Sequence, residues 1–181
     1  MMDLKVKGSD VKSKVFFSVL FTVFFLLAAS IMPYVGFEVP GTALRIVPDI
    51  LFSLSIAAGI VYERKPASVI ALIFGFMSDV FITPPVHLSP LLFFLGAYYS
   101  SKAVGAFTRV NCLTATVASI PFFLLRTIVG GVYLISRGGM GFFEILKTVL
   151  LPELAMNVIS MFFVYIVVNF LYKRFKRRFY I

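Results

Sequence analysis

A few ionisable and amide side chains lie within or at the ends of apolar segments, and these residues are the ones that could do chemistry. They are Asp49, Asp79, Arg126, Glu153 and Asn157. A charged group inside a membrane-spanning helix is costly unless it has a partner, water or a function. Two nearby carboxylates repel each other unless a cation or a proton lies between them, and Arg126 supplies a cation. The pattern predicts a polar intramembrane cluster in which Arg126 pairs with one or more carboxylates.

Two interpretations of this cluster stay open. Pro48-Asp49 and Pro152-Glu153 are also typical helix starts, because proline is tolerated early in a helix and an acid there favours the helix dipole. Asp79 and Arg126 have no such explanation. For these two residues, a structural ion pair and a site for a ligand, ion or partner protein both fit the sequence.

The segments that must position these residues are long and apolar. Of the 181 residues, 60% are hydrophobic and 14% are charged, and the mean hydropathy is +1.00. A soluble domain of this size could not bury so much apolar surface, whereas in lipid such side chains face outward without penalty. Six stretches approach or reach the length of a membrane span: 15–32, 46–62, 67–82, 88–107, 110–135 and 149–172. We expect an all-α integral membrane protein, a six-helix transmembrane bundle formed by a single domain of residues 1–181.

The basic residues predict the orientation of these spans, because cytoplasmic loops of membrane proteins carry an excess of Lys and Arg. With the N-terminus in the cytoplasm, thirteen of the seventeen Lys and Arg residues fall on that side. They include those of the short basic segment 1–14 and of the basic tail 173–181. The tail is expected to contact anionic lipid, so the net charge of +9 requires no nucleic acid. Both termini are therefore predicted to be cytoplasmic.

With this orientation, the polar residues fall in the outer half of the membrane. Asp49, Asp79 and Arg126 lie about 5–8 Å outward of the midpoints of their spans, at 1.5 Å rise per residue. Small side chains spaced by four form stripes on two neighbouring spans, and such stripes let helices approach closely in lipid. The stripes contain Ser53 and Ala57 after Asp49, and Ala67, Ala71 and Gly75 before Asp79. We expect the stripes to pack against each other and to bring both aspartates together.

The segment from Gly138 to Lys147 separates the last two spans. Its glycines, followed by Phe142 and Phe143 beside Glu144, predict a flexible turn and then a short amphipathic segment on the outer surface. This segment is either a simple loop or a docking surface for another extracytoplasmic protein.

The sequence contains no motif of a known catalytic site. H-E-x-x-H, G-x-S-x-G, P-loop and dinucleotide fingerprints are all absent. Cys112 is the single cysteine and His87 the single histidine, which excludes an internal disulfide and metal sites built on several thiolates or imidazoles. A protease dyad of Asp49 and Asp79 is disfavoured because Asp49 begins a helix and neither residue has distinctive surroundings. We expect no enzyme activity, no metal and no cofactor.

Three stretches of the chain carry a family resemblance. They are Val47-Pro48-Asp49-Ile50-Leu51, then Phe74-Gly75-Phe76-Met77-Ser78-Asp79-Val80-Phe81 with His87-Leu88-Ser89-Pro90-Leu91 after a short turn, and Leu151-Pro152-Glu153-Leu154 with Asn157, Tyr165 and the basic tail. Together they resemble MreD, the rod shape-determining membrane protein family, and the length and six predicted spans agree with it. One departure is the turn before His87, where the family usually has Gly and Ser and this chain has Pro84-Pro85.

The resemblance implies a non-enzymatic scaffold of the bacterial cell-elongation complex in the cytoplasmic membrane. MreD-like proteins bind the bitopic protein MreC and act with MreB, RodA and a class B penicillin-binding protein. They support rod shape and side-wall peptidoglycan synthesis. Their fold is similar to that of the S-components of energy-coupling-factor transporters. The family supplies no established catalytic residues to transfer.

The main alternative is a substrate-binding membrane subunit of a small-molecule, vitamin-type transporter, in which the outer cluster captures a solute. Such subunits typically carry Ala-x-x-x-Ala in the first helix, and the Phe-rich stretch from Val15 to Leu27 has no such pattern. A third hypothesis is a proton or ion pathway through Asp79 and Arg126, but the inner halves of the spans offer no polar continuation. The sequence therefore favours the scaffold.

Overall fold

The fold is a set of helices around one short, central helix. The computed structural model describes residues 2–31, 34, 36–38, 45–81, 88–136 and 141–179. Its helices are α1 (Met2–Ser30), α3 (Ile50–Val61), α4 (Arg64–Phe81), α5 (Ser89–Val104), α6 (Cys112–Ser136), α7 (Phe142–Ile145) and α8 (Leu151–Phe179), and a π-helical turn, η1 (Leu146–Leu150), joins α7 to α8. Within these ranges, the extended structure is the antiparallel pair β1 (Phe37–Glu38) and β2 (Arg45–Ile46), in which Phe37 lies opposite Ile46.

Three helical stretches in the described part of the chain have the length and composition needed to cross a membrane. They are Val11–Ser30, Cys112–Ser136 and Phe142–Arg177. These stretches indicate a membrane-embedded helical protein. The other expected spans correspond to α3, α4 and α5, which have 12, 18 and 16 residues. At 1.5 Å rise per residue α3 is only about 18 Å long, shorter than the hydrocarbon layer of about 30 Å.

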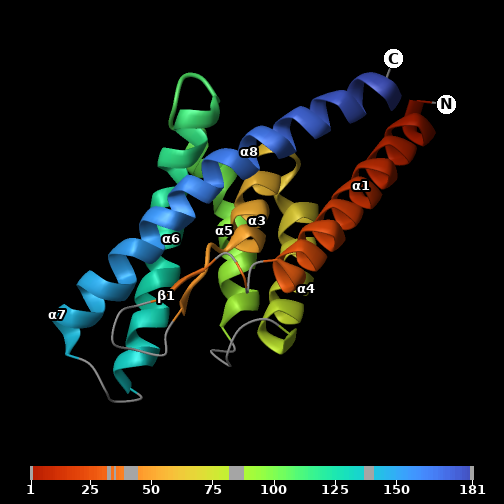
Figure 1. The fold of residues 1–181 in the computed structure, drawn as a ribbon. Helices are drawn as coiled ribbons and strands as arrows, with labels where there is room; N and C mark the ends of the chain where they lie inside the picture. The colour runs from red at the N-terminus through yellow and green to blue at the C-terminus, as the bar shows by residue number, and fades with distance from the viewer. Residues whose placement is uncertain are drawn as a thin grey trace.

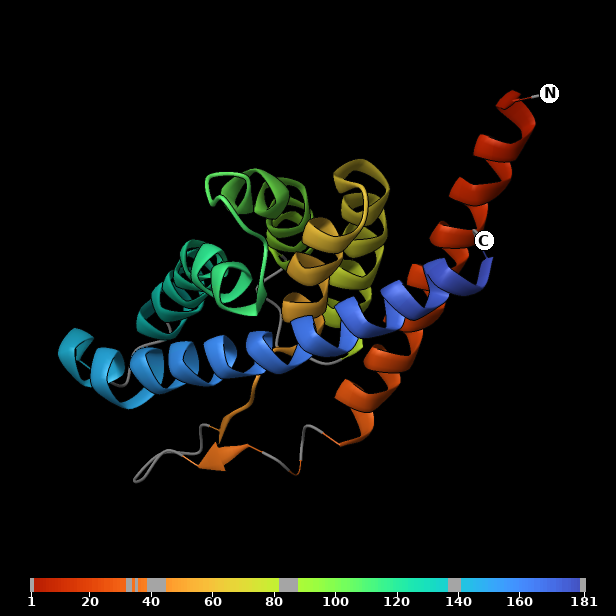
Figure 2. The same ribbon diagram turned by 90° about the horizontal axis from the view of Figure 1, so that it is seen from above.

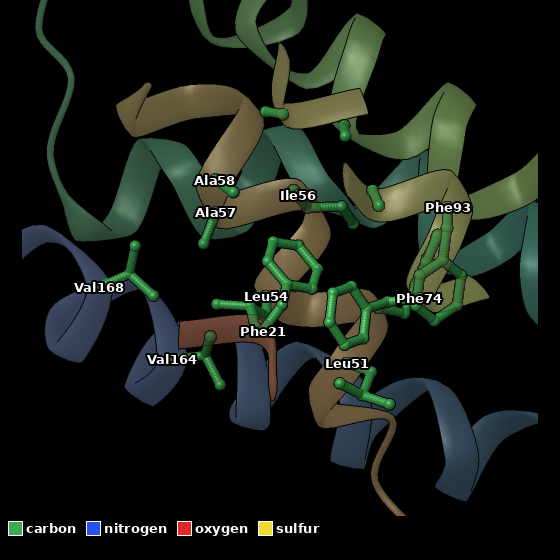
Figure 3. Packing of buried hydrophobic residues seen from close by; sticks show 14 of the residues in the cluster. Phe21, Leu51, Leu54, Ile56, Ala57, Ala58, Phe74, Phe93, Val164 and Val168 are labelled. Carbon is green, nitrogen blue, oxygen red and sulfur yellow. The ribbon is translucent and has the colours of Figure 1, made fainter. Parts of the chain in front are cut away.

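The short helix α3 forms the core of the molecule. Every residue from Leu51 to Gly59 is buried, and α3 packs against α1, α4, α5 and α8. In Figure 3, Val164 and Val168 of α8 face α3 on one side, and Phe21 of α1 approaches Leu54. A helix that is apolar all round is stable only when it is enclosed. Its neighbours must therefore provide any surface that faces lipid.

Helix α8 connects the periphery of the molecule to its centre. Figures 1 and 2 show it running from α7, past α6 and α3, towards α1. Near its C-terminal end, the ring of Phe175 stacks on Phe16 of α1 with centroids 4.6 Å apart, and Tyr172 contacts Phe17 at 5.4 Å. Both chain termini therefore lie at the same end of the molecule (Figure 1).

Apart from one phenylalanine each, the buried side chains of α4 and α6 are small or polar, and both helices expose large apolar side chains. The buried face of α4 contains Ala67, Ser68, Ala71, Phe74, Gly75 and Ser78, and that of α6 contains Ala115, Thr116, Ala118, Ser119, Phe123, Thr127 and Gly131. The exposed face of α4 contains Val69, Leu72, Ile73, Phe76, Val80 and Phe81, and that of α6 contains Leu113, Val117, Leu124, Leu125, Ile128, Val132 and Ile135. A helix of a soluble protein directs its large apolar residues inward instead. The observed pattern is typical of helices in lipid, where outward apolar side chains carry no penalty and small residues allow close packing.

Several helix boundaries differ from those expected. Helix α1 already begins at Met2, and α3 begins at Ile50 because Asp49 caps it. The expected short amphipathic segment from Phe142 is the beginning of the last long helix, because α7 continues through η1 into α8. Gly138, Gly139, Pro84, Pro85 and His87 lie outside the described residues.

Candidate functional site

Asp49, the residue immediately before α3, organises the polar cluster. Its side chain caps the helix, because Oδ1 accepts a hydrogen bond from the Phe52 backbone N–H at 2.9 Å. Such a cap satisfies one of the backbone donors that have no partner within the helix and stabilises it by about 1 kcal/mol. Pro48-Asp49 in the sequence thus marks the observed start of α3.

Arg126 of α6 forms an ion pair with the other carboxylate oxygen of Asp49. Among the described residues, Asp49 Oδ2 has no further hydrogen-bond donor. The guanidinium also lies over the rings of Phe52 and Phe93, at 5.2 and 5.5 Å from their centroids. The side chains of Arg126 and Asp49 are only 13% and 15% exposed. Ring faces attract cations, so Asp49 and Phe52 at the start of α3 and Phe93 of α5 together hold the charge of α6 in place.

Helix α8 contributes amide and hydroxyl groups to the same cluster. Asn157 Oδ1 accepts a hydrogen bond from the Asp49 backbone N–H at 2.7 Å, and the Ser160 hydroxyl lies 2.8 Å from that of Ser53. Each hydroxyl has one hydrogen, so one serine donates to a nearby backbone carbonyl, Ser160 to that of Asn157 or Ser53 to that of Asp49, while the other serine donates to its hydroxyl. Asn157 is 1% exposed. These bonds form a polar seam that ties the first turn of α3 to α8.

Glu153 lies one turn before Asn157 on α8 and is half-buried. It interacts electrostatically with both Arg126 and Asp49, attractively with the first and repulsively with the second. The ion pair that the structure shows for Arg126 is nevertheless with Asp49. Glu153 therefore lies near the ion pair without belonging to it.

Asp79 is half-buried near the end of α4. Within the described chain, the ion pair of Arg126 does not include it. Of the expected cluster, the structure joins Asp49, Arg126 and Asn157 by direct contacts and places Glu153 close by. The meeting of both aspartates at Arg126 is not observed.

The small-residue stripes pack against different helices. A Cβ atom added at Gly75 would lie 2.8 Å from Pro90 Cα and 3.1 Å from the Phe93 side chain, so this stripe meets α5. Ser53 meets Ser160 of α8. The expected packing of one stripe on the other is therefore wrong at these two positions, because α5 and α8 occupy the space. The other members of the stripes, Ala57, Ala67 and Ala71, are fully buried.

A close contact between α3 and α5 was not expected from the sequence. A Cβ atom added at Gly59 would lie 2.0 Å from the Ala97 carbonyl oxygen and 2.5 Å from Ser100 Oγ. Ser100 Oγ donates to the Ile56 carbonyl across the same contact, at 3.2 Å. The sequence did contain a signal for this contact. Ser55 and Gly59 on α3, and Gly96 and Ser100 on α5, are also small residues spaced by four.

Other members of the site were missed for similar reasons. Phe52 and Phe93 are apolar residues in apolar helices, and nothing in the sequence singles them out as partners of an arginine. Ser160 follows Asn157 by three residues and so shares its helix face. That spacing identifies Ser160 once Asn157 is known to face inward.

The cluster is built as a packed ion pair with hydrogen-bonded neighbours rather than as an arrangement of reactive groups. Among the described residues, no three His, Cys, Asp or Glu side chains are placed to hold a metal ion. No protein-family model, no curated protein and no solved structure matches this chain.

Proposed function

We propose that this protein is a non-enzymatic membrane scaffold of the bacterial cell-elongation complex. In this proposal the helices around α3 cross the cytoplasmic membrane, the short α3 is enclosed between them, and the protein binds a bitopic partner of the MreC type. MreB, RodA and a class B penicillin-binding protein form the wider complex, whose activity supports rod shape and peptidoglycan synthesis.

Three helical stretches of the described chain are long and apolar enough to cross a membrane. The distribution of side chains supports membrane crossing by further helices. Helix α4 exposes Val69, Ile73 and Phe76 by 52–65%, while its buried residues are alanine, glycine and serine together with Phe74. This surface is unfavourable in water and favourable in lipid. Helix α3, which is too short to span the bilayer alone, is enclosed by its neighbours and needs no lipid contact.

The position of the basic residues favours a cytoplasmic location for both termini. Lys12, Lys14 and the exposed cations of the C-terminal tail lie on the segments that meet at one end of the molecule (Figure 1). Glu144 and Lys147 lie near the opposite end of the long C-terminal helix. A net excess of Lys and Arg at one end agrees with the positive-inside rule.

The main observation that favours a scaffold over a solute receptor is that protein groups enclose Arg126. A receptor for an anionic or polar solute needs charged groups that face a space for that solute. Here Asp49 neutralises Arg126, and the rings of Phe52 and Phe93 lie close to its guanidinium. These protein groups already satisfy the charge, which favours a role in holding α3, α5 and α6 together.

Affinity purification from membranes of the source bacterium tests this proposal. The tagged protein is extracted in mild detergent after brief crosslinking, and both co-purifying proteins and small molecules are identified by mass spectrometry. We expect a bitopic MreC-type protein together with cell-wall synthases, and loss of rod shape when the protein is depleted. An unrelated tagged multi-pass protein serves as the control.

The alternative function predicts a different result. A vitamin-type transporter subunit would retain a small molecule through purification and would co-purify with the energising module of a transporter. That outcome, with no cell-wall partner and with normal cell shape after depletion, would replace the scaffold with the transporter subunit.

A further inference from the structure

An open cleft of about 360 Å³ lies where α3 is followed by α4, next to the end of α5. Its lining residues are Tyr62, Glu63, Arg64, Lys65 and Ser101. The ring of Tyr62 stacks on Phe17 of α1 with centroids 4.8 Å apart and meets Tyr172 of α8 at 6.1 Å. The cleft therefore lies at the end of the molecule where the two terminal helices meet.

The cleft and its rim carry a concentration of exposed positive charge. Arg64 and Lys65 are exposed, and the Arg64 guanidinium lies 5.5 Å from the centroid of the Tyr98 ring. Lys102, in the last turn of α5, is exposed and lies 5.4 Å from the centroid of the Tyr99 ring. Contacts between cations and aromatic rings orient both side chains. Glu63 is also exposed and opposes part of this charge.

An apolar stripe of α4 begins directly beside these cations. Counting in helical turns from Lys65, the next residues on the same face are Val69, Ile73, Phe76 and Val80. They are 56%, 52%, 65% and 62% exposed. One face of α4 thus has a positive charge at its beginning and apolar side chains along the rest. An anionic lipid has the matching arrangement, a phosphate followed by acyl chains.

We propose that this cleft binds the phosphate headgroup of an anionic phospholipid of the cytoplasmic leaflet, with an acyl chain along the stripe of α4. The inference depends on the proposed membrane embedding and orientation, but not on the identity of the protein partners. Charge complementarity provides attraction for the headgroup, and the adjoining apolar stripe favours a lipid over a free phosphate. The residues that line the cleft belong to α4, to the turn before it and to α5, and not to the basic tail of α8, where Lys173, Arg174, Lys176 and Arg177 are also exposed.

Native mass spectrometry of the full-length protein in detergent tests this site. The protein is titrated with phosphatidylglycerol, with zwitterionic phosphatidylcholine and with inorganic phosphate. Each cation near an anionic lipid contributes about fivefold in affinity, so the Arg64→Gln/Lys65→Gln variant should bind phosphatidylglycerol about 25-fold more weakly. Glu63→Gln should bind it more tightly, because a like charge is removed from beside the phosphate.

The matched control is Lys173→Gln/Arg174→Gln, which removes two exposed cations from the tail. This variant should lose less than about threefold in affinity if the cleft is a discrete site, since only diffuse attraction is reduced. All three altered positions in the cleft are exposed, so thermal unfolding of the variants should match that of the wild type. Equal losses from the cleft and tail variants, or equal binding of the zwitterionic lipid, would overturn the proposal. Binding of inorganic phosphate as tight as that of the lipid would also overturn it.

Discussion

The two charges of the Asp49–Arg126 pair can be removed one at a time and then together. This experiment tests whether the two groups stabilise the protein as an ion pair or act independently. Arg126→Met leaves Asp49 buried and uncompensated, which costs about 3–5 kcal/mol. It also removes the contacts of the guanidinium with Phe52 and Phe93, together worth about 1–2 kcal/mol. Asp49→Asn keeps an oxygen for the cap of α3 and leaves Arg126 uncompensated, at a similar cost of about 3–5 kcal/mol.

The double variant Asp49→Asn/Arg126→Met contains no uncompensated charge from this pair. Replacing a buried ion pair with neutral groups of similar volume is often nearly neutral, so the double variant should lose only the ring contacts, about 1–2 kcal/mol. The ring contacts are lost in both Arg126→Met and the double variant and therefore cancel, so the expected coupling between the two positions is about 6–10 kcal/mol.

Reversible unfolding in mixed detergent micelles measures these free energies, with circular dichroism as the readout. The control is Arg109→Met, which removes an exposed arginine from the loop between α5 and α6. This control should change stability by no more than about 0.5 kcal/mol. Additive losses for Asp49→Asn and Arg126→Met would refute the ion pair as a structural element, because two groups that do not interact add.

Substitutions at Gly59, Ser160 and Asn157 test the packing of α3, and one at Gly130 serves as a control. Gly59→Ala should destabilise the protein by about 1–3 kcal/mol, because its Cβ would overlap a backbone carbonyl of α5; Gly130→Ala, where no atom lies within 4 Å, should stabilise it by up to about 1 kcal/mol. The same micelle unfolding assay measures both, and equal effects would contradict the close crossing. Ser160→Ala should cost about 0.6 kcal/mol, typical of a hydrogen bond between membrane helices, and its effect should vanish when Ser53 is already alanine. Asn157→Ala should cost about 1–3 kcal/mol, because a buried backbone N–H at the start of α3 loses its acceptor; an unchanged unfolding free energy would show that water replaces the side chain.

The helices follow from the sequence more closely than the contacts between them. Apolar runs predicted the long helices that the structure describes. An apolar segment in lipid must satisfy its backbone hydrogen bonds internally, and a helix does so. The boundaries were harder to predict. Polar residues before Val15 continue α1, and the turn η1 extends the last helix back to Phe142. The two-residue pairing of β1 with β2 has no distinct sequence pattern, because so short a ladder needs only two extended segments.

The residues of the polar cluster were identifiable, but their pairing was not. Charged and amide residues within or next to apolar helices are easily recognised. Asp49, Arg126 and Asn157 could therefore be named from the sequence around them alone. Which carboxylate meets Arg126 depends on how the helices are arranged around α3, and helix packing in lipid is decided by small residues that occur on several faces. Asp79 and Glu153 therefore fitted the sequence equally well as partners. The structure selects Asp49.

Accessibility of single cysteines from the two sides of the membrane tests most directly whether the chain is a multi-pass membrane protein with its basic end in the cytoplasm. In a Cys112→Ser background, Lys12→Cys, Lys173→Cys and Glu144→Cys each introduce one thiol at an exposed position. A membrane-impermeant thiol reagent should label Glu144→Cys in intact cells and should label Lys12→Cys and Lys173→Cys only after the membrane is permeabilised. Labelling of Lys12→Cys and Lys173→Cys from opposite sides, or of all three equally in intact cells, would contradict this topology.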